Sequence, residues 1–161
     1  VKRLDAGTYG PAVEIVGEQV VSSAFEAKFS LPYCLAVALL DGSCRINAFT
    51  DSRRSDPAIH EIAKRVFVSK DDECDAAFPK RRSAKVRIEL NDGQTLEFYF
   101  APRKGDPDSP LSDTELSEKY RELAKQVIGE ERSAALEENI WSLEKLPSVA
   151  ELYPALRAAA E

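Results

Sequence analysis

The sequence has no methionine, a single histidine and only three cysteines, Cys34, Cys44 and Cys74. No two cysteines form a Cys-x-x-Cys pair and no second histidine accompanies His60, so a zinc site or an iron–sulfur cluster has little support. An odd number of cysteines fits reduced thiols in the cytoplasm better than a disulfide framework. We therefore expect no metal site and no disulfide.

Long hydrophobic runs and an excess of basic residues are also missing. The longest apolar run, residues 31–40, is too short to cross a bilayer, and no secretory signal opens the chain. The 22 Lys and Arg residues against 28 Asp and Glu give a net charge of −6, which argues against a general nucleic-acid binder. These features predict a cytoplasmic protein that binds neither membrane nor nucleic acid.

The composition is otherwise that of an ordinary globular chain. A length of 161 residues is enough for one domain with a buried core, and 43% hydrophobic residues argue against disorder. Because the sequence opens at Val1 and contains no methionine, we interpret it as a piece of a longer protein.

The first part of the chain alternates predicted strands and helices. Three segments have the β-branched content of strands: residues 11–21, 45–49 and 66–70. Residues 31–40 form a predicted helix, with Ser30 as its N-cap and Gly42 after its end. A second helix is predicted over residues 56–65, where Asp56 is the cap and a proline follows it.

Residues 83–100 carry the clearest pattern in the sequence. Apolar side chains alternate with charged ones on both sides of an Asn-Asp-Gly turn at residues 91–93, which predicts a β-hairpin with one buried face. A proline-rich loop, residues 102–110, separates this hairpin from a helical segment. Ser112 and Glu115 have the spacing of a capping box and mark the beginning of that segment.

These elements predict an α+β fold, with a mostly antiparallel sheet, helices packed on one face and a helical C-terminal tail. We place the α+β core in residues 1–110 and the tail of the same domain in residues 111–161.

The predicted helix over residues 31–40 is the best candidate for a binding site. Backbone N–H groups at a helix N-terminus favour a carboxylate or phosphate, and Lys28, Ser30 and Tyr33 lie at this one. Together they would suit a small carboxylated ligand. The alternative is purely structural: Ser30 caps the helix, Lys28 is solvated and Tyr33 packs. Because the helix lacks a polar stripe, we expect the sheet to cover one side and the tail, a second subunit or a missing domain to cover the other.

Two further features have weaker functional interpretations. Between residues 80 and 104 the sequence has seven bases and three acids, a net charge of 7 − 3 = +4, which could attract an anionic substrate or simply be the solvated face of the hairpin. His60 stands beside Glu61 but has no partner histidine or nucleophile motif, so we predict a structural or surface role for it.

The segment EAKFSLPYCLAVALLDG, residues 26–42, resembles the C-terminal domain of the MmgE/PrpD family. The resemblance continues in VRIELNDGQTLEF, residues 86–98, and in PRKGDPDSPLSDTELSEKY, residues 102–120, so that it extends from about Glu26 to Leu146. The family includes 2-methylcitrate dehydratases, cis-aconitate decarboxylases and iminodisuccinate epimerases. The combination of segments is specific, whereas any one of them alone is weak.

The resemblance implies an enzyme in which an N-terminal helical domain, absent from this chain, carries most acid–base residues. The smaller α+β domain covers the substrate, a di- or tricarboxylic acid, and no metal or organic cofactor takes part. The resemblance also implies that Tyr33 faces the substrate as a catalytic residue, with Lys28 and Ser30 beside it as substrate-binding residues. On this interpretation the chain is inactive alone, and its parent is a lyase or isomerase that forms a homodimer.

The alternative is a non-catalytic α+β module for binding or dimerisation. A third possibility, nucleic-acid binding through the basic hairpin, predicts a strongly salt-dependent affinity for DNA, and we expect none.

Overall fold

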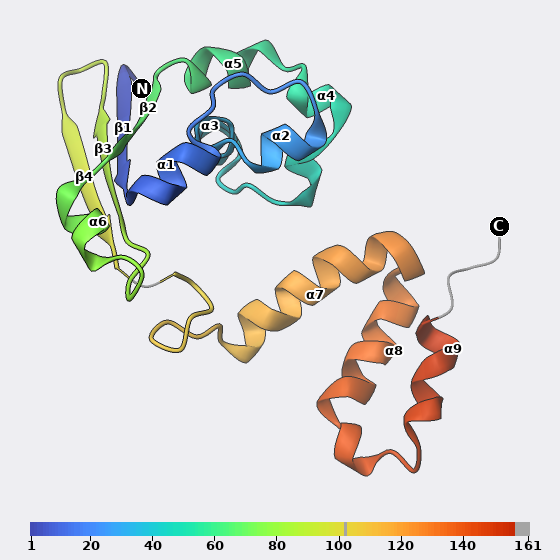
Figure 1. Cartoon of the computed structure of the whole chain (residues 1–161). Helices are drawn as coiled ribbons and strands as arrows, with labels where there is room; N and C mark the ends of the chain where they lie inside the picture. The colour runs from blue at the N-terminus through green and yellow to red at the C-terminus, as the bar shows by residue number, and fades with distance from the viewer. Residues whose placement is uncertain (102, 157–161) are drawn as a thin grey trace. The chain divides into compact units, whose positions relative to one another are not determined.

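The computed structural model describes residues 1–101 and 103–156 (Figure 1). The chain divides into two compact units, Val1–Ser109 and Pro110–Glu161. This division lies one residue from the boundary that we placed between residues 110 and 111. That the tail belongs to the same domain as the core stays a prediction.

The first unit is built on a four-stranded mixed sheet with the strand order β2-β1-β3-β4. Its strands are β1 (Arg3–Thr8), β2 (Val66–Lys70), β3 (Ala84–Glu89) and β4 (Thr95–Phe100). The β1–β3 and β3–β4 pairs are antiparallel, whereas β1 and β2 are parallel. The parallel pair follows from the long crossover between β1 and β2. The predicted α+β class with a mostly antiparallel sheet is confirmed.

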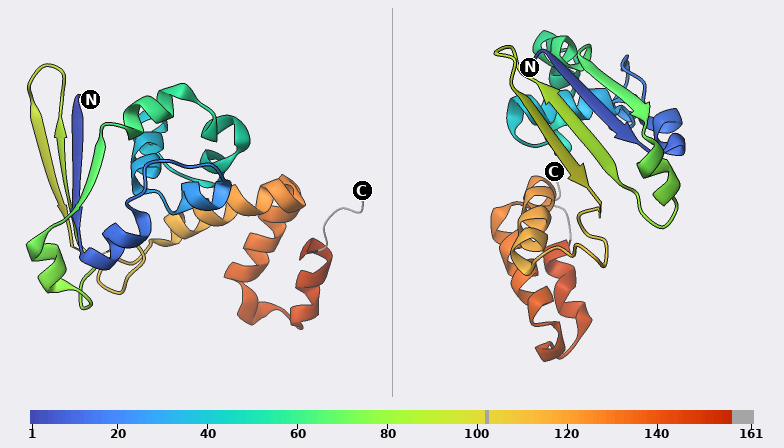
Figure 2. Two further views of the ribbon diagram at one scale, coloured as in Figure 1. Left: turned by 45° about the horizontal axis from the view of Figure 1, so that its top comes forward. Right: turned by 90° about the vertical axis from the view of Figure 1, so that its left-hand side faces the viewer.

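Helices between β1 and β2 pack on one face of this sheet (Figures 1 and 2). The elements of this layer are α1 (Gly10–Val16), α2 (Ala24–Lys28), α3 (Leu31–Asp41), the 3-10 helix η1 (Ile46–Phe49), α4 (Asp51–Arg54) and α5 (Pro57–Ala63). Helix α6 (Asp72–Ala77) follows β2 and contacts β1. The predicted helices over residues 31–40 and 56–65 therefore correspond to α3 and α5.

The helix α3 lies between two hydrophobic clusters. Its residues Leu31 and Leu35 pack on the sheet cluster of Leu4, Ala6 and Val66. Other residues of α3 belong to a second cluster, on the side of α2 and α5: Tyr33, Ala36 and Val37. This two-sided burial explains why α3 is apolar almost all round, as we expected of a covered helix.

Two predicted strands are wrong and one strand was missed. Residues 11–21 contain α1, because Pro11 supplies a first helical turn that outweighs the β-branched residues after it. Residues 45–49 contain η1 rather than a strand. The missed strand is β1, whose buried residues Leu4, Ala6 and Thr8 alternate with less buried ones.

The hairpin β3–β4 is confirmed, but its apolar face is only partly buried. Val86 and Ile88 of β3 pack against the sheet cluster. On β4, the edge strand, Leu96, Phe98 and Phe100 are 41%, 47% and 55% exposed. The expectation of one buried face is therefore wrong for β4. Among the described residues, nothing covers about half of the surface of these three apolar side chains.

The second unit is helical, as predicted for the tail. It contains α7 (Asp113–Ile128), α8 (Glu130–Trp141), the 3-10 helices η2 (Leu143–Lys145) and η3 (Val149–Leu152), and α9 (Tyr153–Leu156). The predicted capping box is confirmed, because the Glu115 N–H donates to the Ser112 Oγ and the Ser112 N–H donates to the Glu115 carboxylate. In the described ranges no helix is long and apolar enough to cross a membrane.

Candidate functional site

The N-terminus of α3 is where the sequence places the candidate site, and the structure shows it closed. Ser30 is 1% exposed; its Oγ accepts the Tyr33 N–H at 3.2 Å and donates to the Glu18 carbonyl at 2.5 Å. Pro32 has no N–H. The N-cap prediction for Ser30 is therefore confirmed, but the cap uses the amide that an anion would need.

Tyr33 is buried in the helical cluster, with 1% of its surface exposed. Its hydroxyl donates to the Ala48 carbonyl of η1 at 2.6 Å. Burial raises the pKa of the phenol above 10, while the positive charge of Arg53 opposes that rise. Because the proton is held by this hydrogen bond, Tyr33 stays neutral at physiological pH and ties α3 to η1.

Lys28 is the exposed member of the predicted set. Its Nζ lies 5.8 Å from the centroid of the Phe49 ring, a cation–π distance, and the Phe49 ring lies 6.3 Å from the ring of Tyr33. The structure thus brings Lys28, Ser30 and Tyr33 to one end of α3. It does not place their polar groups around a common open space, since those of Ser30 and Tyr33 face the interior.

Two arginines at this end of the unit were missed from the sequence. Arg53 pairs with Asp41 and Asp56, each at 2.6 Å, and Arg54 donates to the Ser22 carbonyl and pairs with Asp51. Both lie close enough to Tyr33 to affect its pKa. The Arg54 Nε is buried and has no hydrogen-bond partner among the described residues. The feature of the sequence that could have identified them is the pair of adjacent arginines at residues 53–54.

His60 and the basic stretch have structural contacts. The His60 Nε2 lies 2.7 Å from the Arg54 carbonyl, so the ring helps to fix the segment that carries both arginines. On the outer face of the sheet, Lys85 pairs with Glu73 at 2.7 Å and with Asp71 at 3.1 Å, which raises the Lys85 pKa. The predicted structural role of His60 agrees with its contact, and part of the basic stretch is already neutralised.

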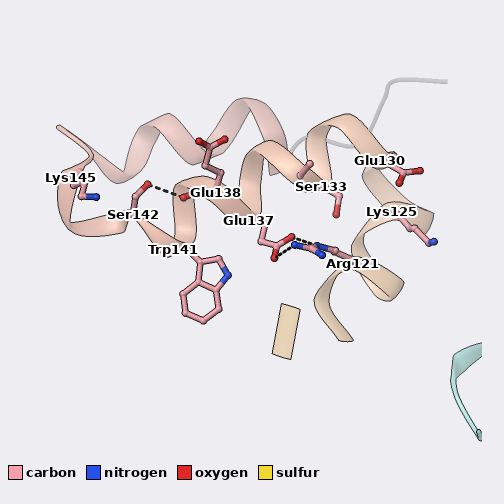
Figure 3. Close-up of a pocket in the computed structure, with 10 residues that line it drawn as sticks. Arg121, Lys125, Glu130, Ser133, Glu137, Glu138, Trp141, Ser142 and Lys145 are labelled. Carbon is pink, nitrogen blue, oxygen red and sulfur yellow. Dashed lines mark hydrogen bonds and ion pairs between the residues drawn. The ribbon is translucent and has the colours of Figure 1, made fainter. Parts of the chain in front are cut away.

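The second unit has a pocket of its own, with a volume of about 890 Å³ (Figure 3). Its charged lining is balanced between three bases and three acids: Arg121, Lys125, Lys145, Glu130, Glu137 and Glu138. The guanidinium of Arg121 donates twice to the Glu137 carboxylate, at 2.6 and 2.9 Å. Because this bidentate pair neutralises itself, the pocket has no excess of donors for an acidic ligand.

The described parts of the chain contain no set of metal ligands. There, no group of three or more His, Cys, Asp or Glu side chains could hold an ion. The fold therefore defines the class of protein as an α+β domain with a helical extension. Within the expected site, the hydroxyl groups of Ser30 and Tyr33 make hydrogen bonds inside the domain.

The chain belongs to the MmgE/PrpD family. The description of the matching family profile is MmgE/PrpD C-terminal domain, and the match covers residues 1–145. It begins at Val1, earlier than the Glu26 at which we placed the start of the resemblance, because β1 and α1 are part of the domain.

Comparison with individual proteins gives the same relationship. The chain is 28% identical over 139 residues to a cis-aconitate decarboxylase of Aspergillus terreus, an alignment that covers 85% of this chain and 28% of that protein. It is 28% identical over 141 residues to the cis-aconitate decarboxylase of Mus musculus, covering 84% of this chain and 28% of that protein. A cis-aconitate decarboxylase-like protein of Aspergillus oryzae, oryM, is 44% identical over 69 residues. This alignment covers 43% of this chain and 14% of that protein. The chain thus spans little more than a quarter of the length of the two decarboxylases.

Proposed function

We propose that this chain is the substrate-covering C-terminal domain of an enzyme that acts on a small di- or tricarboxylic acid, and that it is inactive alone. The observation that carries the proposal is the family match over residues 1–145, together with relatives named cis-aconitate decarboxylases. The reaction would be decarboxylation, dehydration or epimerisation, with a proton transferred at the carbon next to a carboxylate and no cofactor.

This domain would contribute positive charge that binds the substrate carboxylate, and it would exclude water from the substrate. Lys28 is exposed near the start of α3. The Nε of Arg54 is buried and has no hydrogen-bond partner among the described residues. Two cations can hold a carboxylate and lower the free energy of the anion that forms when the adjacent carbon loses its proton. Removal of water by a covering domain strengthens both interactions.

Tyr33 remains the proposed catalytic residue, with Lys28 and Ser30 as proposed substrate contacts. In the structure the Tyr33 hydroxyl is engaged by the Ala48 carbonyl, so a catalytic role requires η1 to shift when substrate binds. A phenol released in this way could donate its proton to the substrate.

The test uses the complete enzyme, with this domain joined to its helical partner, and follows the conversion of cis-aconitate and related di- and tricarboxylic acids into decarboxylated, dehydrated or epimerised products. Tyr33→Phe should lower kcat about tenfold or more if the hydroxyl transfers a proton. Tyr99→Phe, on the outer face of the sheet, is the matched control and should leave kcat unchanged. A wild-type kcat for Tyr33→Phe would exclude the hydroxyl from the chemistry. Failure of cis-aconitate and related acids as substrates would contradict the enzymatic proposal.

A second candidate function, a binding or dimerisation module, is favoured by the exposed apolar residues of β4. Leu96, Phe98 and Phe100 lie on one side of an edge strand, an arrangement typical of a surface that pairs with another protein. The proposed homodimer would use such a surface. Phe98→Lys should then convert a dimer into a monomer in sedimentation experiments, whereas Glu97→Lys on the opposite side of β4 should not.

A further inference from the structure

An open pocket of about 500 Å³ lies on the helix-covered side of the sheet, outside the proposed carboxylate site. It is bordered by the ends of β1, β3 and β4 and by the helices α1 and α3. Most of its lining is apolar: Ala12, Val16, Leu31, Leu35, Val86 and Phe100. Its size is typical of a small-molecule site, and apolar walls favour a ligand with a hydrocarbon part.

The same pocket is lined by three basic side chains, Arg82, Arg103 and Lys104. The register of the hairpin brings them together: Ala84 of β3 pairs with Phe100 of β4, so the residues before β3 and after β4 meet at one end of the sheet. No acidic side chain is among the described residues that line the pocket. The nearby Asp106 pairs with Arg103 at 2.8 Å, and both Arg103 and Arg82 lower the pKa of its carboxyl group. The charged side chains among the described lining residues are thus all basic.

This pocket lies on the other side of α3 from Tyr33. Leu31 and Leu35 line the pocket from the sheet side of α3. Tyr33 belongs to the other hydrophobic cluster, and its hydroxyl points to η1. A ligand in the pocket would therefore contact neither Tyr33 nor Lys28.

We propose that this pocket binds a small amphipathic monocarboxylate, with its hydrocarbon chain against the apolar walls and its carboxylate among Arg82, Arg103 and Lys104. Arg82 suits this role because a planar guanidinium binds a carboxylate through two parallel hydrogen bonds, whereas the guanidinium of Arg103 already donates twice to Asp106. A di- or tricarboxylic acid fits less well, because its further carboxylates would be buried against apolar side chains. The ligand class therefore differs from the proposed substrate.

The direct test is titration of the chain with octanoate, followed by calorimetry and by NMR shifts of the Ala12 and Leu35 methyl groups. Octanoate should bind saturably. Octanol, which keeps the chain without the charge, and acetate, which keeps the charge without the chain, should each bind about tenfold more weakly or not at all. Equal binding of octanol and octanoate would overturn the assignment of the basic side chains, and absence of octanoate binding would overturn the whole proposal.

Variants locate the site. Ala12→Phe fills the apolar part and should abolish octanoate binding, while Arg82→Gln should weaken it about tenfold. Arg87→Gln makes the same change of charge on the opposite face of β3 and should leave binding unchanged. If Ala12→Phe fails to fold, comparison of Arg82→Gln with Arg87→Gln still tests whether octanoate binds in this pocket. Equal affinities of these two variants for octanoate would mean that it binds elsewhere.

Discussion

At the scale of single residues, the Tyr33 hydroxyl joins two segments that the sequence separates by fifteen positions. Its hydrogen bond to the Ala48 carbonyl lies inside the helical cluster, away from water. In the folded chain, Tyr33→Phe would leave that carbonyl buried without its donor. We expect the free energy of unfolding to fall by about 1–2 kcal/mol in urea titrations. Tyr99→Phe, at a half-exposed position, should cause little change, and equal effects of the two variants would contradict this account.

Cys34 gives a second prediction at this scale. Burial, and then the neighbouring Cys44, raise the pKa of the Cys34 thiol from 9.0 to about 12. Because the thiolate is the reactive form, alkylation of Cys34 by iodoacetamide at pH 8 should be about a hundredfold or more slower in the folded chain than in urea. Mass spectrometry of the labelled peptides measures the difference. Cys34 is only partly buried, and rapid labelling without unfolding would show that its thiol ionises more easily than this account requires.

The sequence was sufficient to predict how Ser30 and Asp56 cap their helices, because capping depends on residues a few positions apart. It was not sufficient to predict that the Tyr33 hydroxyl is enclosed. That enclosure depends on η1, a segment that returns to α3 only in three dimensions. The contribution of Arg54 was missed for the same reason, since its partner at Ser22 is remote in sequence.

At the scale of elements, strong local signals gave correct predictions. The α3 boundaries, the β3–β4 hairpin and the capped start of α7 all follow from turn and capping residues in the right order. The strand β1 was missed because its sequence, RLDAGT, contains aspartate, alanine and glycine and a single β-branched residue, Thr8. Pairing on both sides stabilises it, and such tertiary stabilisation has no local signature.

The capping box of α7 can be tested directly. Ser112→Ala removes the oxygen that accepts the Glu115 N–H, so the helical unit should lose about 1 kcal/mol of stability. Thr114→Ala, an exposed substitution within the first turn, is the matched control and should be neutral or slightly stabilising. Thermal unfolding followed by circular dichroism gives both values. A larger loss for Thr114→Ala than for Ser112→Ala would mean that the cap contributes little.

At the scale of the whole molecule, several carboxyl groups have a lowered pKa in the folded chain: Asp5, Asp71, Asp75, Asp106 and Glu137. For Asp71, the Cys74 N–H is the largest cause, and pairing with Lys85 adds to it. A group whose folded pKa is depressed contributes stability above its unfolded pKa, and that contribution is lost as the pH falls through the folded pKa. Stability should therefore decline below about pH 4.

Asp71→Asn tests this pH dependence. The variant should melt at a lower temperature than the wild type at pH 7, and the difference should shrink as the pH falls below about 4 and the Asp71 carboxylate of the wild type is protonated. Asp92→Asn, in the exposed hairpin turn, serves as the control and should follow the wild-type curve. A gap between Asp71→Asn and the wild type that stays constant with pH would exclude the carboxylate charge as its cause.

The position of β1 in the strand order has a consequence for how the sheet assembles. This strand precedes both of its neighbours in the sequence, residues 66–70 on one side and 84–89 on the other. During translation β1 therefore stays unpaired until the helical crossover and β2 have emerged from the ribosome. Such non-local pairing slows folding and leaves an intermediate open to aggregation. A chaperone that shields Arg3–Thr8 until β2 and β3 are available would limit that aggregation.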